Sequence, residues 1–436
     1  MEVIVKVVQF ILALSLLIFI HELGHFFFAK LFRIRVDKFY IFFNPWFSLI
    51  KFRIGETEYG IGWIPFGGYC KIAGMIDESM DTEHINRPPQ SWEYRSKPVW
   101  QRLCVMLGGV FMNVVLALAI YIGISYAYGE NYVAPEEVTY EFNDLGRSMG
   151  FMDGDIITGM NGDKAHNALD IPKRMVLYHP ATVEVEREGV PVTIRFGKEQ
   201  AAKMLHSPGF MKMNFLFVVQ GTMPESAAAE AGILPGDMLT AFNGEPLRLF
   251  DHYREAFLEH KGEKVEITVV RMEDGESVQV TLPVQISDEG IIGATLDLPF
   301  RHIAYTFWQA IPAGFKETGV QLSDYWQQLK LIFNSNTKAY KSLGGLISIG
   351  NIFPGTWDWY KFWMMTAFLS IVLAIMNILP IPALDGGHVV FLLYEVIMRR
   401  KPSDKFLIHA QTVGLILLFA LLFYANANDI YRFFIK

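Results

Sequence analysis

The chain has 436 residues, of which 52% are hydrophobic, and its mean hydropathy of +0.25 exceeds that of ordinary soluble proteins. The net charge of -7 and the lack of a basic tract argue against a protein that binds nucleic acid. The two cysteines, Cys70 and Cys104, form no CxxC pair and lie outside the polar middle of the chain. We therefore expect neither a disulfide framework there nor a thiolate metal site.

The first predicted element is an apolar run from about Val3 to Phe32, which is long enough to cross the ~30 Å hydrocarbon core of a bilayer as a helix. It begins like a signal peptide, with Lys6 and an apolar core. No small-x-small cleavage site follows, so we expect the helix to be retained in the membrane.

This run contains the sequence His21-Glu22-Leu23-Gly24-His25. Two histidines four residues apart share one face of a helix and can hold one Zn²⁺, and Glu22 falls beside them as a base for a water molecule. The alternative is an anchor helix whose polar turn lies at the membrane surface. Ionisable residues within an apolar span are costly, which favours metal chemistry inside the membrane.

Residues 37–75 are rich in aromatic and β-branched residues, and turn residues interrupt them at Asn44-Pro45 and Gly55-Glu56. This pattern predicts a β-hairpin, which ends in Pro65-Phe66-Gly67-Gly68-Tyr69. Because the strands are apolar and adjoin a membrane helix, we expect the hairpin to dip into the bilayer. An ordinary surface hairpin is the alternative.

A polar loop over residues 77–97 leads to the second predicted span, residues 99–128. Gly108-Gly109 and Asn113 lie within it, and small residues at such positions permit close contact between helices.

The polar middle of the chain contains an internal repeat, because the pattern of residues 150–162 recurs 82 residues later in residues 232–244. In each copy a Gly-Asp pair precedes a strand and an Asn-Gly turn, which is typical of PDZ modules. PDZ modules bind an extended chain end as an added strand. We expect two such domains, at residues 129–206 and 207–292. A packed spacer or steric filter is the alternative, and the first copy matches the pattern less fully.

Apolar residues at helical spacing predict amphipathic connecting helices that lie at an interface within residues 293–359, and an ordinary helix packed on the PDZ pair is the alternative. A third apolar run, about 360–379, leads into Asn377-Ile-Leu-Pro-Ile-Pro-Ala-Leu-Asp385-Gly-Gly-His388. The two prolines and the glycine pair break the helix and place Asp385 at membrane depth, where an isolated Asp is a candidate functional residue. A last span covers about residues 406–424.

Basic residues set the expected orientation. They follow the first span, precede the second and recur at Arg399-Arg400-Lys401, so the positive-inside rule places those loops in the cytoplasm. We expect a polytopic α-helical membrane protein with four transmembrane helices, a membrane-associated β-hairpin and two inserted extracytoplasmic PDZ domains of the α+β class. Residues 1–128 and 360–436 form its membrane parts.

Catalytic zinc takes three protein ligands and keeps one position open. His21 and His25 supply two of them. The residues alone leave both Asp385 and His388 as candidates for the third.

The His-Glu-x-x-His motif at the end of a first span, the Asn377-x-x-Pro-x-Pro-x-Leu-Asp385-Gly-Gly motif and the tandem PDZ modules together resemble the site-2 protease family. These proteins are intramembrane zinc metalloproteases, and the match is to their bacterial RseP type and covers nearly the whole chain. The resemblance implies the following roles: His21, His25 and Asp385 as Zn²⁺ ligands, Glu22 as catalytic base, Asn377 as a contact to substrate or to the developing oxyanion, and Gly67, Gly68 and Tyr69 as part of a hairpin that pairs with the unwound substrate.

The expected function is cleavage of transmembrane segments of single-span membrane proteins, such as an anti-sigma factor or a remnant signal peptide, in the cell inner membrane. The PDZ pair would admit only substrates already trimmed of bulky outer domains. Two alternatives come from other classes. A catalytically inactive PDZ scaffold would be expected to lose Glu22 or Asp385, and an ion or proton transporter would not require the His-x-x-x-His spacing.

Overall fold

The computed structural model describes residues 1–75, 88–207, 209–273, 275–334 and 344–435. The chain forms two compact units. Residues 1–129 and 304–436 form the membrane unit, and residues 130–303 form the inserted unit. The polar loop predicted over residues 77–97 lies partly outside the described residues.

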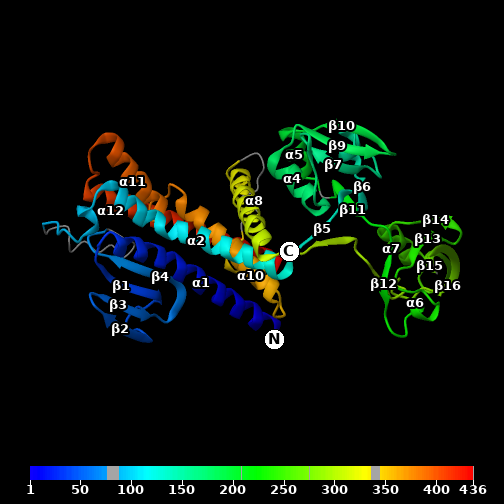
Figure 1. Cartoon of the computed structure of the whole chain (residues 1–436), viewed down its shortest axis with the longest axis horizontal. Coiled ribbons are helices and arrows are strands. Elements are labelled where there is room, and N and C mark those ends of the chain that lie inside the picture. Colours follow the sequence, from blue (N-terminus) through cyan, green and yellow to red (C-terminus); the bar gives the residue numbers. More distant parts are fainter. Residues whose placement is uncertain (76–87, 208, 274, 335–343, 436) are drawn as a thin grey trace. The chain divides into compact units, whose positions relative to one another are not determined.

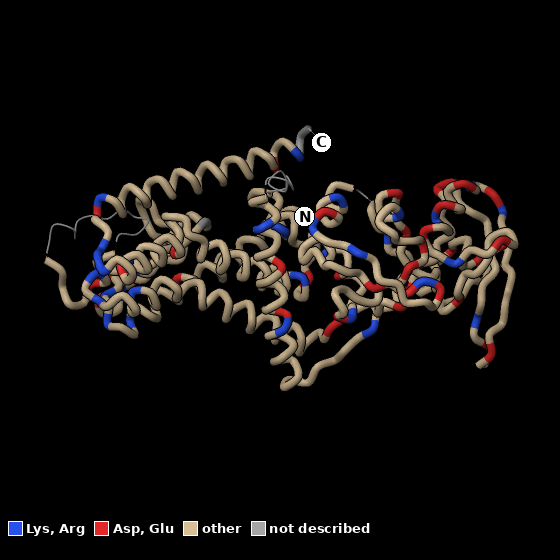
Figure 2. Tube along the Cα trace, turned by 90° about the horizontal axis from the view of Figure 1, so that it is seen from above, with Lys and Arg blue, Asp and Glu red and all other residues tan. Residues whose placement is uncertain are grey.

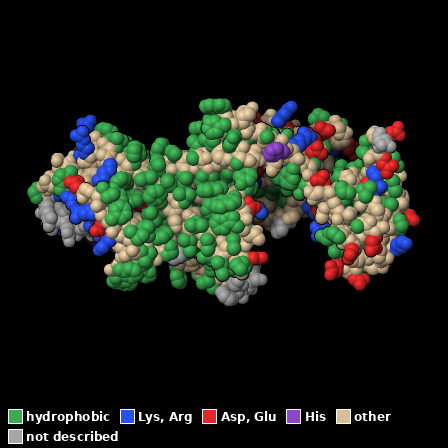
Figure 3. Space-filling model, turned by 60° about the horizontal axis from the view of Figure 1, so that its bottom comes forward, with side chains coloured by type: hydrophobic (Ala, Val, Ile, Leu, Met, Phe, Trp, Pro, Cys, Tyr) green, Lys and Arg blue, Asp and Glu red, His purple; other side chains and the backbone are tan. Residues whose placement is uncertain are grey.

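Among the described residues of the membrane unit, four helices are long and apolar enough to cross a bilayer: α1 (Glu2–Leu31), α2 (Val99–Tyr128), α10 (Trp359–Ile378) and α12 (Asp404–Ile435). They occupy the positions of the four predicted spans. Helix α2 packs against both α1 and α10 (Figure 1). Hydrophobic side chains cover much of the visible face of this unit (Figure 3), as expected for a surface that contacts lipid instead of water.

Helix α12 continues well beyond the predicted end at residue 424. The extension carries Asn426 and Asp429, whose side chains accept hydrogen bonds from backbone N–H groups of Gly345, Leu346 and Ser348. These donors lie at the start of the short helix α9 (Leu346–Gly350), where backbone N–H groups have no partner within the helix. The polar end of α12 is therefore stabilised by a contact that hydropathy cannot reveal.

The segment predicted as a hairpin is a four-stranded sheet with the order β2-β3-β1-β4. Its strands are β1 (Val36–Phe43), β2 (Ile50–Ile54), β3 (Thr57–Ile61) and β4 (Ile64–Ile72). Strands β2 and β3 form a hairpin, but β3 pairs with β1 in parallel, which alternation of residues does not indicate. Strand β4 pairs with β1 along one side, and no described strand pairs with its other edge.

The segment 293–359 differs from the predicted run of amphipathic helices. Its first part forms β17 (Ala294–Leu296) and β18 (Phe300–Ile303), which belong to the inserted unit. Helix α8 (Phe307–Phe333) follows and packs against α2, and it continues through Pro312. Pro312 is the sixth residue of α8, so it removes the backbone hydrogen bond that an N–H at this position would donate to the carbonyl oxygen of Trp308. The short helix α9 lies further along the same segment.

The inserted unit contains two modules, each with its own hydrophobic core. The first consists of β5 (Glu130–Val133), β6 (Thr139–Phe142), α3 (Asp144–Ser148), β7 (Ile156–Met160), β8 (Asp163–Lys164), α4 (Ile171–Tyr178), β9 (Thr182–Arg187), β10 (Val190–Arg195), α5 (Lys198–Leu205) and β11 (Met211–Asn214). The second consists of β12 (Val219–Thr222), α6 (Ala227–Glu230), β13 (Met238–Phe242), β14 (Glu245–Pro246), α7 (Phe250–Glu259), β15 (Lys264–Glu273), β16 (Glu276–Gln285) and β17. The described residues also include three short 3-10 turns: η1 (Tyr94–Ser96) in the membrane unit, and η2 (Pro135–Glu137) and η3 (Ala168–Asp170) in the first module.

The two modules share the same strand arrangement. Their main sheets have the orders β10-β9-β7-β8 and β16-β15-β13-β14, in which strands at the same place correspond. Each module also has a two-stranded sheet, formed by β6 and β11 in the first and by β12 and β17 in the second. A fully buried Asp in each module forms an ion pair with an Arg, 2.7 Å between Asp155 and Arg187 and 2.7 Å between Asp237 and Arg271. Because β11 belongs with β6, the first module extends to residue 214, beyond the boundary predicted at 206.

Candidate metal centre

Helix α1 carries the first two candidate ligands on one face. His21 and His25 lie one turn apart, and their Nε2 atoms are 3.2 Å from each other. The buried positions of this helix carry no β-branched residue, which favours the helical conformation. The His25 ring is buried.

The third candidate ligand comes from the break between α10 and α11 (Asp385–Met398). Pro380 and Pro382 interrupt the helix as predicted, because proline cannot continue the backbone hydrogen-bond pattern. Ala383 then adopts a left-handed backbone conformation with φ of 78°, which turns the chain so that α11 begins at Asp385.

This break brings Asp385 to the two histidines. Its Oδ2 atom lies 3.3 Å from His21 Nε2 and 3.4 Å from His25 Nε2. Among the described residues, these three side chains form the one group of His, Cys, Asp or Glu close enough together to hold a metal ion.

The spacing of the three atoms fits a zinc ion. Ligand bonds of ~2.0–2.2 Å in a tetrahedral site place the ligand atoms roughly 3.3–3.5 Å apart, and the three observed separations are 3.2, 3.3 and 3.4 Å. The Oδ2 atom of Asp385 is buried and has no well-aligned hydrogen-bond donor among the described residues. A cation between the three atoms would satisfy all of them at once.

Groups on α2 orient the imidazoles. His25 Nδ1 lies 2.8 Å from the carbonyl oxygen of Val105, to which it donates, so its Nε2 lone pair faces Asp385. His21 Nδ1 lies 3.3 Å from Asn113 Nδ2, and the buried Oδ1 of Asn113 has no partner among the described residues. With its amide turned over, Asn113 accepts a hydrogen bond from His21 Nδ1 and fixes the same tautomer there.

Close approach of α2 to these rings requires glycine. A Cβ atom at Gly109 would lie 2.5 Å from both His21 Cε1 and His25 Nε2. Real Cβ atoms essentially never make contacts this short, so Gly109 provides the space that the imidazoles occupy.

Strand β4 reaches the centre from the other side. The backbone N–H of Cys70 donates a hydrogen bond to the Glu22 carboxylate. A Cβ atom at Gly68 would lie 2.8 Å from the Ile18 side chain and 3.6 Å from Glu22 Cγ, so the strand backbone lies directly against α1. The edge strand β4 therefore lies beside the candidate base.

These groups surround a cavity of about 780 Å³. The predicted residues Gly68 and Tyr69 line it, whereas Gly67 precedes them on β4 and is not part of the lining. Asn377 contributes a hydrogen-bond donor, with Nδ2 3.3 Å from His21 Nε2. His388 also lines the cavity, one turn after Asp385, but it is not in the group of three converging side chains.

Some groups at the centre could not be recognised as such in the sequence. A backbone group such as the Val105 carbonyl carries no residue-specific signal. Asn113 can be recognised in the sequence as an amide within an apolar span, but the sequence does not show that it contacts His21.

The sequence profile of peptidase family M50 matches residues 9–421. The chain belongs to this family. A protein of Clostridium perfringens named "Putative zinc metalloprotease" is 28% identical over 430 residues, which cover 96% of this chain and 97% of that protein. The regulator of sigma E protease of Haemophilus influenzae is 27% identical over 452 residues, which cover 97% and 98%.

Membership of family M50 makes the protein a zinc metalloprotease, as the sequence predicted. Its four long apolar helices make this M50 protease a membrane protein.

Proposed function

We propose that the protein cleaves peptide bonds within the transmembrane segments of single-span membrane proteins. The observation that carries this proposal is the convergence of three side chains: His21 and His25 on a helix long and apolar enough to span a bilayer, and Asp385, which follows the break after another such helix. A protease centre on such helices meets peptide bonds that lie in the membrane, and these belong mainly to spanning segments.

In this proposal His21, His25 and Asp385 hold the zinc ion, and His388 does not. When bound, zinc supplies Lewis-acid activation of a water molecule and of the peptide carbonyl. The hydrogen bonds from His25 to Val105 and from His21 to Asn113 keep both imidazoles in the tautomer that offers Nε2 to a metal.

Glu22 moves the proton. Its carboxylate takes the proton of the attacking water and later delivers it to the nitrogen of the leaving amine. The N–H of Cys70 holds this carboxylate at the edge of the sheet, next to the candidate ligands. Asn377 donates its amide N–H toward the carbonyl oxygen that becomes negatively charged.

Substrate binds as an extra strand on the free edge of β4, beside Gly67, Gly68 and Tyr69. A helical segment hides its carbonyl groups in its own hydrogen bonds, so it must unwind before hydrolysis. No described strand pairs with the outer edge of β4, so a substrate strand added there gains replacement hydrogen bonds, which offset part of the cost of unwinding.

We assign the two inserted modules to the PDZ class on their shared Gly-Asp motif and strand arrangement. In this proposal they lie outside the cytoplasm at the inner membrane. Basic residues gather at one end of the membrane unit (Figure 2), and they include those just before the start of α2. The chain enters the inserted unit only after the last residue of α2, which predicts that this unit lies on the other side of the membrane. The modules exclude substrates with bulky outer domains. Anti-sigma factors and remnant signal peptides are the substrate candidates, since one relative is named a regulator of sigma E protease.

The first prediction concerns Glu22. The Glu22→Gln variant keeps its zinc, because Glu22 is not a ligand, but loses the base, so cleavage of a single-span reporter falls by roughly 10²–10⁴-fold. Reporter cleavage and zinc content of the purified protein are measured together. Glu2→Gln on the same helix is the matched control and retains full activity. Undiminished cleavage by Glu22→Gln would contradict the proposed mechanism.

A further inference from the structure

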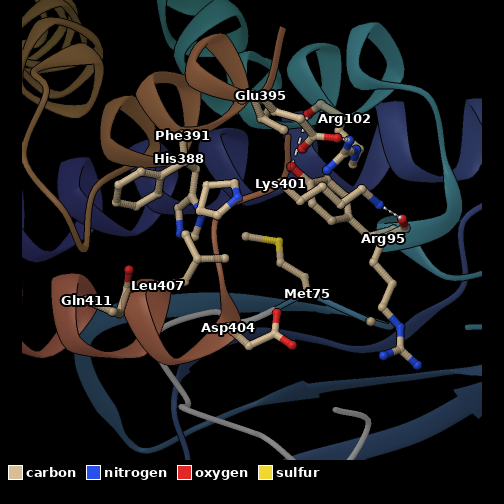
Figure 4. A pocket seen from close by; sticks show the side chains of 14 residues that line it. Met75, Arg95, Arg102, His388, Phe391, Glu395, Lys401, Asp404, Leu407 and Gln411 are labelled. Carbon is tan, nitrogen blue, oxygen red and sulfur yellow. Dashed lines mark hydrogen bonds and ion pairs between the residues drawn. The ribbon is translucent and has the colours of Figure 1, made fainter. Parts of the chain in front are cut away.

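A second, smaller cavity lies at the basic end of the membrane unit, where the loop between α11 and α12 meets the start of α2 (Figure 4). We call it the basic-end pocket, and its volume is about 120 Å³. This is several times the volume that one ordered water needs. Its walls include the apolar side chains of Phe391, Leu392 and Leu407.

The basic-end pocket adjoins the cavity of the metal centre. Met75, His388 and Gln411 line both. His388 lies one turn after Asp385 on α11, so the pocket opens directly beside the candidate ligands. A chain bound at the metal centre can therefore continue into the pocket.

Gln411 has an unmet hydrogen-bonding requirement at this junction. It is only 3% exposed, and its Nε2 atom has no partner among the described residues. Its side chain extends from α12 toward the rings of His388 and Phe391 (Figure 4). Thr412, the next residue of the helix, bonds to the carbonyl of Ile408. A buried amide donor without a partner is costly, and it indicates that a bound molecule supplies the acceptor.

The direction of β4 indicates what that molecule is. Cys70 of β4 contacts Glu22, and the chain then runs through Ile72 to Met75 at the mouth of the pocket. Strand β4 ends at Ile72, and the N–H of Met75 donates to the carbonyl oxygen of Ile72, so the protein chain turns at this point. A substrate strand that lies on the edge of β4 and continues past Cys70 enters the basic-end pocket, because Met75 and Gln411 line both cavities.

The charges of the pocket do not favour an anion such as a lipid headgroup. The guanidinium of Arg102 is paired with Glu395 at 2.6 Å, and that of Arg95 is paired with Glu93 at 2.6 Å. Lys401 donates to the backbone carbonyl of Arg95, and Asp404 adds a carboxylate to the rim. The cations are therefore largely neutralised, while the walls are apolar.

We propose that the basic-end pocket is a substrate subsite for the part of the chain that leaves the metal centre toward the basic end of the spans. Gln411 Nε2 donates a hydrogen bond to one backbone carbonyl of the substrate, and the walls formed by Phe391, Leu392 and Leu407 receive one apolar side chain. This subsite rests on the proposed cleavage of transmembrane segments and adds a specificity position to it.

The test compares wild type with two variants on a set of single-span reporters that differ at one position each. Gln411→Met removes the donor at similar volume and raises KM by roughly 3–10-fold with kcat unchanged. Leu407→Trp fills the pocket and shifts the preference at a single reporter position toward smaller side chains. Thr412→Val is the matched control, and all variants keep one zinc per chain.

Three outcomes are informative. The KM increase together with the shifted preference at one position, on the basic-end side of the scissile bond, supports the subsite. Unchanged KM in Gln411→Met and unchanged preference in Leu407→Trp, with an active wild type, overturn the subsite alone. A wild type that hydrolyses soluble peptides but no spanning reporter overturns the proposed function, and the subsite with it.

Discussion

At the scale of single residues, the candidate metal centre consists of three candidate ligands and of the groups that orient them. His25 is fixed by the Val105 carbonyl at 2.8 Å, and His21 faces the amide of Asn113 at 3.3 Å. Partners of this kind set both the tautomer and the direction of a metal-binding imidazole. The sequence presents the ligands through their spacing but does not present these partners.

The second prediction tests Asn113. Asn113→Leu removes the acceptor for His21 Nδ1–H and lowers zinc affinity by roughly 10–100-fold. Asn113→Asp keeps an acceptor oxygen and retains most of the affinity. Zinc affinity is measured by competition with a chelator. Equal affinities for wild type and Asn113→Leu would show that Asn113 does not orient His21.

At the scale of elements, a buried ion pair joins the helix that begins with Asp385 to the helix that orients the imidazoles. Arg102 of α2 and Glu395 of α11 lie 2.6 Å apart, with side chains 8% and 13% exposed. Removing one partner of such a pair leaves an uncompensated buried charge, whereas replacing both by apolar residues is often neutral. The pair therefore holds α11 in register with α2.

The third prediction follows from this pair. Arg102→Leu destabilises the protein by roughly 3–5 kcal/mol, and the double variant Arg102→Leu/Glu395→Leu recovers most of that loss. The comparison is made by thermal unfolding in detergent. Lys361→Leu breaks the exposed pair with Asp358 and serves as the control, with an effect of about 0–1 kcal/mol. A double variant as unstable as the single variant would contradict this account.

The sequence predicts where helices and strands lie better than it predicts which of them pair or pack together. Four apolar runs, the broken third run and the strands after α1 follow from composition and from proline chemistry, and helices or strands are present at each place. The parallel pairing of β1 with β3 and the extension of α12 do not follow. Both depend on contacts between distant segments, such as Asp429 with Ser348, which local pattern does not encode.

The same limit applies to the candidate centre. The spacing of His21 and His25 is local and was readable, whereas the choice between Asp385 and His388 was not, because both lie in one broken segment. The positive φ of Ala383 and the start of α11 at Asp385 decide which of the two faces the histidines. A left-handed alanine has no sequence signal comparable to that of glycine.

At the scale of the whole molecule, the first and last strands of the inserted unit pair with each other. Strand β18 pairs with β5, with Ile303 opposite Glu130, so the two connections to the membrane unit start from neighbouring residues. The unit can therefore be removed without separating α2 from α8. The metal centre lies wholly in the membrane unit and does not require the inserted unit.

The fourth prediction uses this geometry. A variant in which a short Gly-Ser linker replaces residues 130–303 keeps its zinc and cleaves reporters that carry a bulky outer domain, which wild type excludes. Paired reporters with and without the outer domain are compared in both proteins. A variant that still rejects the bulky reporter would show that the inserted unit is not the size filter.

The central claim is that His21 and His25 of the first span and Asp385 of the broken third span hold one zinc ion together. The most direct measurement is the zinc content of purified wild-type, Asp385→Asn and His388→Ala proteins. The account predicts about one zinc per chain in wild type and in His388→Ala, and almost none in Asp385→Asn. Loss of zinc in His388→Ala with retention in Asp385→Asn would contradict it.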